Sequence, residues 1–348
     1  MGSVGIIVNP WAGKDVRRLH APVGHTPDTA KIGIVRRVAI GALDAGADRV
    51  YVSRDVGRIA ERAVKGVDGA ELVDGPSTGS PLDTRRAAAQ MADLGCAAVA
   101  VLGGDGTSRD VTMGWRDVPM IPISTGTNNV FPGFVDGSSA GTAAGLVACG
   151  LLALTDVAPR AKLLTVDITM PSGDLLQDIA LVDVGVIDDH GTGARAVVKP
   201  GLIRMVVAAL AVPASTGLSA IAGRTRPIAA DEDGGVVVRL GGTHRYVRVP
   251  IIPGSFDVLP IESIDVLPDG GSVRVDGPCV LAYDGERDRV LPAGAAAVIT
   301  VSRTGPYVID VARTLRAAAE RHLFDAPAPS PLPESVPAPR PTEASHGH

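Results

Sequence analysis

The sequence predicts an α/β fold, with an N-terminal parallel-sheet domain followed by a β-rich C-terminal domain that has few helices. Between residues 4 and 153, short β-branched runs alternate with Ala-rich segments of helical period, which is typical of a parallel sheet with helices on both faces. After Asp156 helical patterns become scarce, and apolar alternation between turn signals takes over. The chain of 348 residues also exceeds the usual length of one domain, about 100 to 200 residues, so we expect two.

The first domain contains short apolar runs that we interpret as strands. They are residues 4–9, 49–53, 70–73, 97–102 and 120–124. Helices are expected between them, where apolar residues recur at helical spacing: Ile32, Val35, Ala39 and Ala42, then Thr84, Ala87, Ala88 and Met91. Ser80 followed by Pro81 predicts the start of the second of these helices.

A further Ala-rich helix is expected over residues 139–152. Gly137, Gly141 and Gly145 are spaced by four residues there, a pattern that favours close packing on another helix over ligand binding.

The second domain is predicted to be made mainly of strands. They are residues 162–170, 178–186, 236–240, 246–252, 263–267, 279–283 and 297–302. Residues 202–212 fit either a helix or a buried strand. A strand at 307–309 and a helix at 311–324 then suggest that the chain returns to the first domain.

These patterns give the expected domain boundaries. Residues 1–154 together with about 306–325 are expected to form an α/β domain, and residues 155–305 are expected to form a β-rich domain. The Pro-rich residues 326–348 are expected to be a disordered tail.

Composition excludes several classes of function. Hydrophobic residues make up 45% of the chain and the net charge is only -5, which argues for a globular protein and against binding to the phosphate backbone of nucleic acids. Aromatic residues are 3%, so a platform for base stacking is poorly supplied. No signal peptide or membrane-spanning run is recognised, so we expect a cytoplasmic protein without a membrane partner. The cysteines Cys96, Cys149 and Cys279 fit neither a disulfide framework nor a zinc site, and are interpreted as buried small hydrophobes.

Three polar loops follow predicted parallel strands, and they carry the functional signal. They are Asn9–Lys14, Gly103–Thr107 and Ser124–Asn129. Because the carboxyl ends of parallel strands meet at one rim of a sheet, we expect the three loops to offer backbone donors, amides and hydroxyls to one anionic ligand. Any one of these loops taken alone also fits an ordinary glycine turn.

Asp105 lies among three glycines in the second loop. An alternative interpretation is that Asp105 caps a helix, where Asp is favoured, but capping needs no flanking glycines. A carboxylate beside phosphate instead suggests general-base work on a hydroxyl or binding of a divalent metal. Other nucleotide motifs are missing, since Gly13–Lys14 completes no P-loop and no Gly-x-Gly-x-x-Gly follows the first strand. The histidines lack metal-ligand spacing, and no serine lies in a nucleophile elbow.

These loops resemble the NAD kinase and diacylglycerol kinase superfamily. Gly103–Thr107 matches its Gly-Gly-Asp-Gly-Thr signature, Asn9–Pro10 resembles its opening motif, and Thr125–Asn129 resembles its second nucleotide loop. Asp284–Glu286 is similar to its late Asp-Gly-Glu segment. The resemblance covers residues 1 to about 325 and is closest to AcoX-type ATP-NAD kinase-like proteins associated with acetoin catabolism.

The resemblance implies a two-domain, NAD kinase-like fold with a Rossmann-like N-terminal sheet, an active site between the domains, and ATP with Mg²⁺ as the phosphoryl donor. It implies that Asp105 accepts the proton of the acceptor hydroxyl. The residues that it assigns to the nucleotide are Asn9, Gly103, Gly104, Gly106, Thr107, Thr125, Gly126, Thr127, Asn128 and Asn129. It also implies a homo-oligomer.

On the acceptor side, the resemblance points to Asp183, Thr216, Gly217, Ser219, Asp284 and Glu286, without identifying metal ligands. Two departures stand out: Val182 occupies the place of an expected Asn, and Arg226 is bulky and basic. They motivate the hypothesis that the acceptor is a small molecule other than NAD, smaller or anionic. A lipid kinase and a non-catalytic nucleotide-binding regulator are the alternatives.

Overall fold

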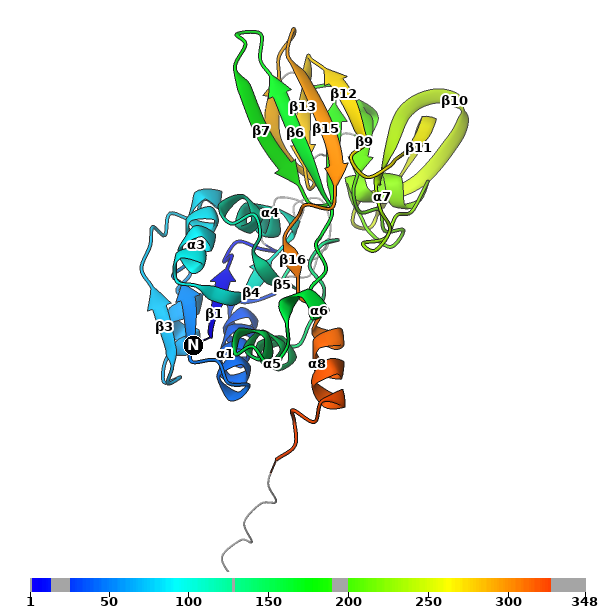
Figure 1. Ribbon diagram of the computed structural model, residues 1–348. Coiled ribbons are helices and arrows are strands. Elements are labelled where there is room, and N and C mark those ends of the chain that lie inside the picture. The colour runs from blue at the N-terminus through cyan, green and yellow to red at the C-terminus, as the bar shows by residue number, and fades with distance from the viewer. Residues whose placement is uncertain (1, 14–25, 127–128, 190–199, 327–348) are drawn as a thin grey trace, which may run out of the picture.

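The computed structural model describes residues 2–13, 26–126, 129–189 and 200–326. It shows two lobes, one built around a parallel sheet with helices and the other built mainly of antiparallel strands (Figure 1). This confirms the predicted fold class.

The described part of the first lobe contains a six-stranded parallel sheet in the order β16-β5-β4-β1-β2-β3. Its strands are β1 (Ser3–Val8), β2 (Arg49–Ser53), β3 (Ala70–Val73), β4 (Cys96–Gly103), β5 (Pro119–Ser124) and β16 (Tyr307–Val308). Each prediction for the first five strands is correct to within one or two residues. The strands β1, β4 and β5 are neighbours, so the loops that follow them begin side by side.

Helices cover both faces of this sheet. They are α1 (Asp28–Asp44), α2 (Ile59–Val64), α3 (Pro81–Asp93), α4 (Asp105–Gly114), α5 (Gly137–Ala148), α6 (Leu154–Val157) and α8 (Val311–Glu320). Adjacent residues of β1 point to opposite faces, and so Ile6 packs in a cluster with α1 and α5, whereas Ile7 packs in a cluster with α3 and α4. The helix α3 starts at Pro81 with Ser80 at its N-cap, as the sequence predicts.

The glycines of α5 let this helix lie against α1. A Cβ on Gly141 would stand 2.3 Å from the Val38 carbonyl oxygen, and one on Gly145 would stand 2.5 Å from the Ala42 carbonyl oxygen. The predicted packing role of these glycines is confirmed. The helix itself ends at Ala148, earlier than the predicted residue 152.

Two antiparallel sheets form the described part of the second lobe. A six-stranded sheet has the order β11-β10-β9-β8-β13-β14, and a four-stranded sheet has the order β12-β15-β6-β7. The strands are β6 (Leu163–Thr169), β7 (Leu175–Ala180), β8 (Asp183–Ile187), β9 (Ile203–Ala208), β10 (Gly235–Ile252), β11 (Ser255–Leu267), β12 (Ser272–Asp276), β13 (Cys279–Tyr283), β14 (Glu286–Leu291) and β15 (Ala296–Ser302). Apolar residues of both sheets, such as Val166 and Leu281, share one core, while α7 (Leu218–Gly223) packs on the opposite face of the six-stranded sheet.

Several predictions for this lobe need correction. Residues 178–186 are not one strand, because the chain changes sheets at Leu181–Val182 between β7 and β8. Residues 236–240 and 246–252 are not separate strands, since both belong to β10, whose pairing with β11 shifts register between Leu240 and Arg245. The strands β12 and β14 were not predicted. The ambiguous segment 202–212 contains the strand β9.

Two adjacent chain segments connect the lobes. The Ala161 amide donates to the Pro306 carbonyl, and the Gly305 amide donates to the Ala161 carbonyl. The chain then returns to the first lobe, where β16 pairs with β5 and is followed by α8. Residues 327–348, which make up nearly all of the predicted tail, lie outside the described residues.

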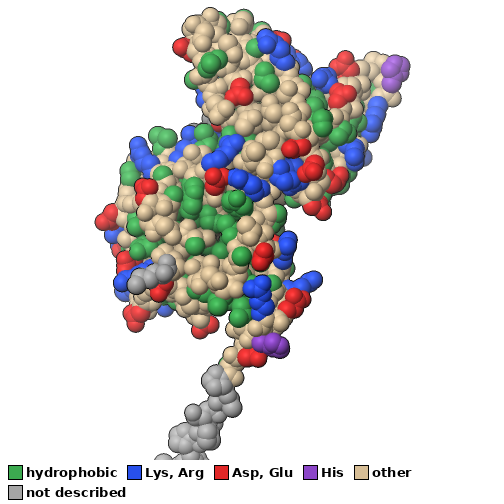
Figure 2. Space-filling view, viewed as in Figure 1, with side chains coloured by type: hydrophobic (Ala, Val, Ile, Leu, Met, Phe, Trp, Pro, Cys, Tyr) green, Lys and Arg blue, Asp and Glu red, His purple; other side chains and the backbone are tan. Residues whose placement is uncertain are grey.

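The surface shows mixed charge. Lys and Arg side chains alternate with Asp and Glu over the face seen in Figure 2, and several basic groups lie at the waist between the lobes. Among the described helices, none is long and apolar enough to cross a membrane.

Candidate functional site

The loops after β1, β4 and β5 meet at one rim of the parallel sheet. The Asn9 amide donates to the Leu102 carbonyl at 3.0 Å, and the Thr125 amide donates to the Gly103 carbonyl at 3.1 Å. These bonds continue the strand pairing past the ends of the strands. The structure therefore brings together the parts of the three predicted loops that it describes; Lys14, Thr127 and Asn128 lie outside the described residues.

Asp105 is the first residue of α4, and its side chain is turned away from bulk water, with the residue 9% exposed. Its Oδ1 accepts hydrogen bonds from the backbone amides of Val130 and Phe131, at 3.0 and 2.8 Å. The capping interpretation does not hold, because Gly104 is the N-cap residue and the Asp105 carboxylate binds a different segment. Its position is thus fixed from outside its own helix.

Side chains of the loops occupy the space that the glycines leave. A Cβ on Gly103 would stand 2.4 Å from the Thr107 side chain, and one on Gly104 would stand 2.7 Å from Asn129 Oδ1. On Gly126 it would stand 2.9 Å from Asn129 Nδ2. These three glycines therefore allow the loops to pack on each other, which is a requirement separate from ligand contact.

Hydrogen bonds between side chains tie the loops together. Asn9 Nδ2 donates to Thr107 Oγ1 at 2.8 Å, and Asn129 Nδ2 donates to Ser124 Oγ at 2.8 Å. The Thr125 hydroxyl is fully buried and has no hydrogen-bond partner within the described ranges. A buried hydroxyl of this kind is a group that a bound ligand would satisfy.

Glu286 reaches this rim from the second lobe. It follows the two-residue turn Asp284–Gly285, whose positive φ values of 49° and 81° fit the tight hairpin between β13 and β14. A Cβ on Gly106 would lie 3.8 Å from Glu286 Oε1, so the carboxylate stands beside the first turn of α4. The predicted acceptor-side residue Glu286 and the predicted nucleotide-side residue Gly106 are thus brought together.

Asp284 has a different environment. Its carboxylate is buried and accepts hydrogen bonds from the amides of Leu181, Val182 and Asp183, where the chain passes from β7 to β8. Burial raises the pKa of the Asp284 carboxyl, and the Arg109 charge and these amides oppose that rise. The side chain thus stabilises the corner at which the chain changes sheets. Val182 and Asp183 are themselves buried at this corner.

The predicted residues Thr216, Gly217 and Ser219 lie at the start of α7, where Gly217 is the N-cap and Ser219 is in the first turn. The Gly217 amide donates to the Pro250 carbonyl, and Ser219 Oγ donates to Ser215 Oγ at 3.1 Å. The contacts of α7 run to β8, β9 and β10, on the face of the six-stranded sheet that does not pack on the four-stranded sheet. Arg226, just after this helix, is exposed.

Sequence reasoning missed a buried ion pair that joins the lobes. Arg109 of α4 donates to Asp178 Oδ1 of β7 at 2.6 Å and to the Ile179 carbonyl at 2.7 Å. Its guanidinium also lies 4.7 Å from the centre of the Tyr283 ring. The two charged residues stand far apart in the sequence and belong to no motif, so no local signal pairs them.

Asp110 is a second residue that the motifs do not reveal. Burial raises the pKa of its carboxyl to about 6, Glu286 adds to the rise, and Arg85, whose Nε lies 2.8 Å from Oδ1, opposes it. Asp110 lies on α4 between Arg109 and Val111, one helical turn beyond Gly106.

The carboxylates near the start of α4 suit a metal ion that binds together with the phosphates of a ligand. No group of three or more His, Cys, Asp or Glu side chains in the described ranges is arranged to hold a metal ion. Mg²⁺ commonly binds through one or two carboxylates together with the phosphates of a substrate. Asp105, Asp110 and Glu286 supply carboxylates near the start of α4, and the N-terminus of that helix favours an anion.

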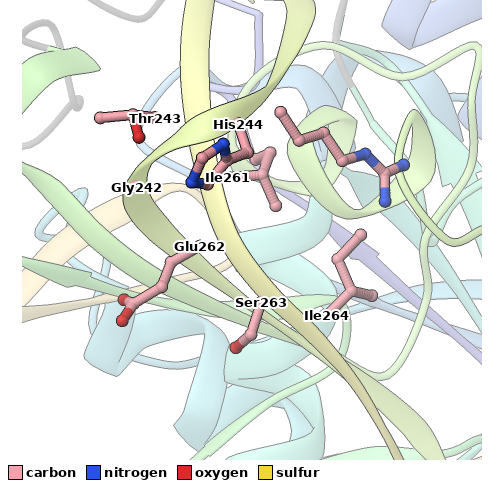
Figure 3. A pocket seen from close by; sticks show the side chains of 8 residues that line it. Gly242, Thr243, His244, Ile261, Glu262, Ser263 and Ile264 are labelled. Carbon is pink, nitrogen blue, oxygen red and sulfur yellow. The ribbon is translucent and has the colours of Figure 1, made fainter.

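A separate pocket lies in the β10–β11 hairpin, away from these loops (Figure 3). It is lined by residues 242–245 and 261–264, where the two strands shift register. His244 and Glu262 are seen on its wall in Figure 3, and none of the residues singled out from the sequence contributes to its lining.

Comparison with known proteins agrees with this architecture. The family model of the ATP-NAD kinase N-terminal domain matches residues 4–148. The family model of the acetoin catabolism protein X C-terminal domain matches residues 162–304. Acetoin catabolism protein X of Cupriavidus necator is 33% identical over 335 residues, which covers 92% of this chain and 93% of that protein.

Among solved structures, yeast NADH kinase complexed with NADH has a similar fold. Its TM-score is 0.50 at 15% sequence identity, and the match covers 94% of this chain and 89% of that one. The identity and coverage shared with the Cupriavidus protein, together with the two domain matches, show that the chain belongs to the acetoin catabolism protein X family.

Proposed function

We propose that this protein is an ATP-dependent kinase that transfers a phosphoryl group to a hydroxyl of NAD or a related small molecule. The observation that carries the proposal is the position of Asp105, which is buried at the start of α4 with Glu286 of the other lobe beside the same helical turn. The match to the ATP-NAD kinase N-terminal domain supports the reaction class.

Phosphoryl transfer depends mainly on positioning and on neutralisation of spread negative charge. In the proposed reaction, Asp105 accepts the proton of the acceptor hydroxyl while that oxygen forms a bond to the γ-phosphorus and the bond to ADP breaks. The N-terminus of α4 favours the negative charge of the phosphates. Bound Mg²⁺ would neutralise phosphate charge, with Asp110 and Glu286 as the carboxylates available to hold it beside the phosphates.

The acceptor that we propose is a hydroxyl compound, of which NAD is one candidate. Val182, where an Asn is expected, is buried, and its amide donates to the Asp284 carboxylate. This position thus presents no side-chain amide to a ligand. A smaller or anionic hydroxyl compound is therefore included in the acceptor class that we propose.

The test is an assay of ADP formation with ATP, Mg²⁺ and a panel of acceptors that begins with NAD and NADH. We expect Asp105→Asn to lower kcat at least about 100-fold, the low end of a general-base contribution, while ATP binding by calorimetry is largely kept. Asp136→Asn is the matched control, because the Asp136 carboxylate also accepts from a backbone amide at a helix start, at 3.0 Å, but as the N-cap of α5.

Turnover by Asp105→Asn at the wild-type rate would overturn the catalytic role of Asp105. Absence of turnover with every acceptor, combined with tight ATP binding, would favour the alternative of a nucleotide-binding regulator.

A further inference from the structure

The β10–β11 hairpin is apolar on both of its faces, but the fold covers only one of them. On the covered face, Val249, Leu259 and Ile261 are buried in a cluster with α7 and the six-stranded sheet. Neighbouring residues of a strand point to opposite faces, and here Tyr246 and Val258 are 59% and 61% exposed. Strands with apolar residues on both faces are typical of sheets that are covered on both sides. The opposite face of the hairpin therefore has the composition of a buried surface.

The exposed residues of the hairpin lie next to each other. Tyr246 pairs with Pro260 and Arg248 pairs with Val258, so the two members of each pair share a face. Phe256 is 52% exposed and lies two residues before Val258 on the same strand, with its ring centre 5.9 Å from the Arg248 guanidinium carbon. We call these five residues the outer face of the hairpin, which curves out from the second lobe in Figure 1. A contiguous exposed apolar surface of this kind marks an interaction site.

Charges of both signs flank the centre of the outer face. Arg248 lies two residues beyond Tyr246 toward the tip of the hairpin, and Glu262 lies two residues beyond Pro260 in the other direction. Both charged residues are exposed, and neither takes part in an ion pair within the described ranges. The Tyr246–Pro260 pair therefore lies between a cation and an anion that each lack an opposite charge.

This arrangement is complementary to itself. The two copies of a two-fold dimer present the same surface to each other, so each contact occurs twice. An axis that crosses the strands at the Tyr246–Pro260 pair exchanges the two ends of the face, which brings Arg248 of each copy to Glu262 of the other. The Tyr246 rings then meet at the centre, where aromatic side chains contribute most to binding.

Two other ways of covering the hairpin fit less well. Anionic lipids would repel the Glu262 carboxylate at the border of the face. Addition of a strand at the free edge of β11 is disfavoured by Pro260, which has no amide to donate.

We propose that the outer face of the hairpin is the interface between two copies of this chain, with Arg248 of each copy paired with Glu262 of the other. The proposal goes beyond the kinase activity and does not depend on it, because no residue of the Asp105 site takes part.

The experiment measures the dimer dissociation constant of the full chain by sedimentation velocity over a concentration series. We expect wild type to form a dimer, and Arg248→Glu and Glu262→Arg each to weaken it at least about 100-fold, because each reversal places like charges together twice. An equimolar mixture of the two variants should form a heterodimer about as stable as the wild-type dimer, since both contacts again join opposite charges. Restoration by mixing also shows that both variants are folded.

Three further variants separate the outer face from the rest of the surface. Tyr246→Ala should weaken the dimer about 30-fold or more, the threshold of an interface hot spot. Leu175→Ala removes a side chain that is 78% exposed on β7 and should leave the dimer unchanged. Asp265→Arg is the matched charge reversal on β11, where the carboxylate pairs with Arg239 of the same copy, and it should also leave the dimer unchanged.

Several results would overturn the proposal. Wild type that stays monomeric at every concentration has no such interface, and a monomer that sediments with vesicles of phosphatidylcholine and phosphatidylserine would assign the face to a membrane instead. A dimer that is weakened by neither charge reversal, by Leu175→Ala as much as by Tyr246→Ala, or by Asp265→Arg as much as by Glu262→Arg would place the interface elsewhere. A mixture of the two reversed variants that stays monomeric would exclude the pairing of Arg248 with Glu262. None of these measurements uses ATP, so failure of the kinase proposal is recognised separately.

Discussion

At the residue scale, the start of α4 collects carboxyl groups from two lobes in a partly buried environment. Asp105 is fixed by two backbone amides, Asp110 pairs with Arg85, and Glu286 approaches Gly106 from the second lobe. The Glu286 charge adds to the burial that raises the pKa of the Asp110 carboxyl. Such an arrangement costs stability in the unliganded protein and becomes favourable when a cation or a basic group binds there.

The raised pKa of Asp110 predicts a pH dependence of stability. Its folded-state pKa is about 6 against an ordinary 3.8, so between these values the folded protein holds a proton that the unfolded chain has lost. The stabilisation is complete below the ordinary pKa and is lost as pH rises through 6. Relative to Asp110→Asn, wild type should therefore lose about 2 kcal/mol of unfolding free energy between pH 4 and 7, measured by urea titration.

The control for this series is Asp136→Asn. The Ser139 amide lowers the pKa of the Asp136 carboxyl, so its contribution is present above the ordinary pKa and disappears only at lower pH. Its difference from wild type should stay flat from about pH 5 upward. An equally flat difference for Asp110→Asn would contradict the assigned pKa.

At the element scale, the pairing of α1 with α5 depends on glycines, which have no side chain to hold the two helices apart. Gly137 and Gly141 both leave room for backbone of α1, and a Cβ on the latter would stand 2.3 Å from a carbonyl oxygen that cannot rotate away. Close approach of two helices increases the contact of their backbones and buries the apolar stripe of α1. The pair lies directly under β1 and β4, and so it supports the strands that carry the candidate site.

We expect Gly141→Ala to destabilise the protein by about 1–3 kcal/mol because the added methyl overpacks the helix pair. Gly33→Ala is the matched control on α1. A Cβ there meets only the end of the Arg37 side chain at 3.4 Å, so the better helix propensity of Ala should stabilise by about 0.5–1 kcal/mol. Chemical denaturation of both variants checks the opposite signs, and destabilisation by both would show that the glycines act through backbone flexibility instead.

At the scale of the whole molecule, covalent crossings link the lobes, and so does the buried contact of Arg109 with Asp178 and the Ile179 carbonyl. Arg109 and Asp178 are 6% and 4% exposed, and their bond joins α4 to the edge of the four-stranded sheet. Tyr283 at the end of β13 also contacts Arg109, and the turn that follows β13 leads to Glu286. The link through Arg109 therefore helps to fix Glu286 relative to Asp105, which lies on the same helix as Arg109.

Removing one charge of this pair should be costly. Asp178→Asn leaves the Arg109 guanidinium buried without its carboxylate, and we expect a loss of about 3–5 kcal/mol of unfolding free energy. The double substitution Arg109→Met with Asp178→Leu should lose less, because neither member of the ion pair is left buried without the other. Asp265→Asn removes an exposed partner of Arg239 and should change stability by under about 1 kcal/mol.

Urea unfolding of the four proteins measures these differences. A loss in Asp178→Asn no larger than that in Asp265→Asn would show that the contact does not link the lobes energetically.

The local pattern of the chain was enough to predict the parallel sheet. Strands such as β2 and β4 are short apolar runs between glycine turns, and neighbouring side chains within a run pack on opposite faces. The prediction failed at residues 178–186, where apolar character continues through a change of sheet. Burial on either side of Leu181–Val182 requires the same residue types, so no local signal marks the corner that Asp284 stabilises.

The sequence by itself determined the order of the strands in the parallel sheet domain and the rim at which Asn9, Gly104 and Thr125 meet, because strand period, glycine turns and parallel pairing act over short stretches of chain. Only the tertiary structure decided which distant residues face that rim. Glu286 beside Gly106, Asp178 beside Arg109 and the exposed Trp11 beside Gly79 depend on how the lobes and loops pack. Long-range packing brings together residues whose separation in the chain carries no information about their contact.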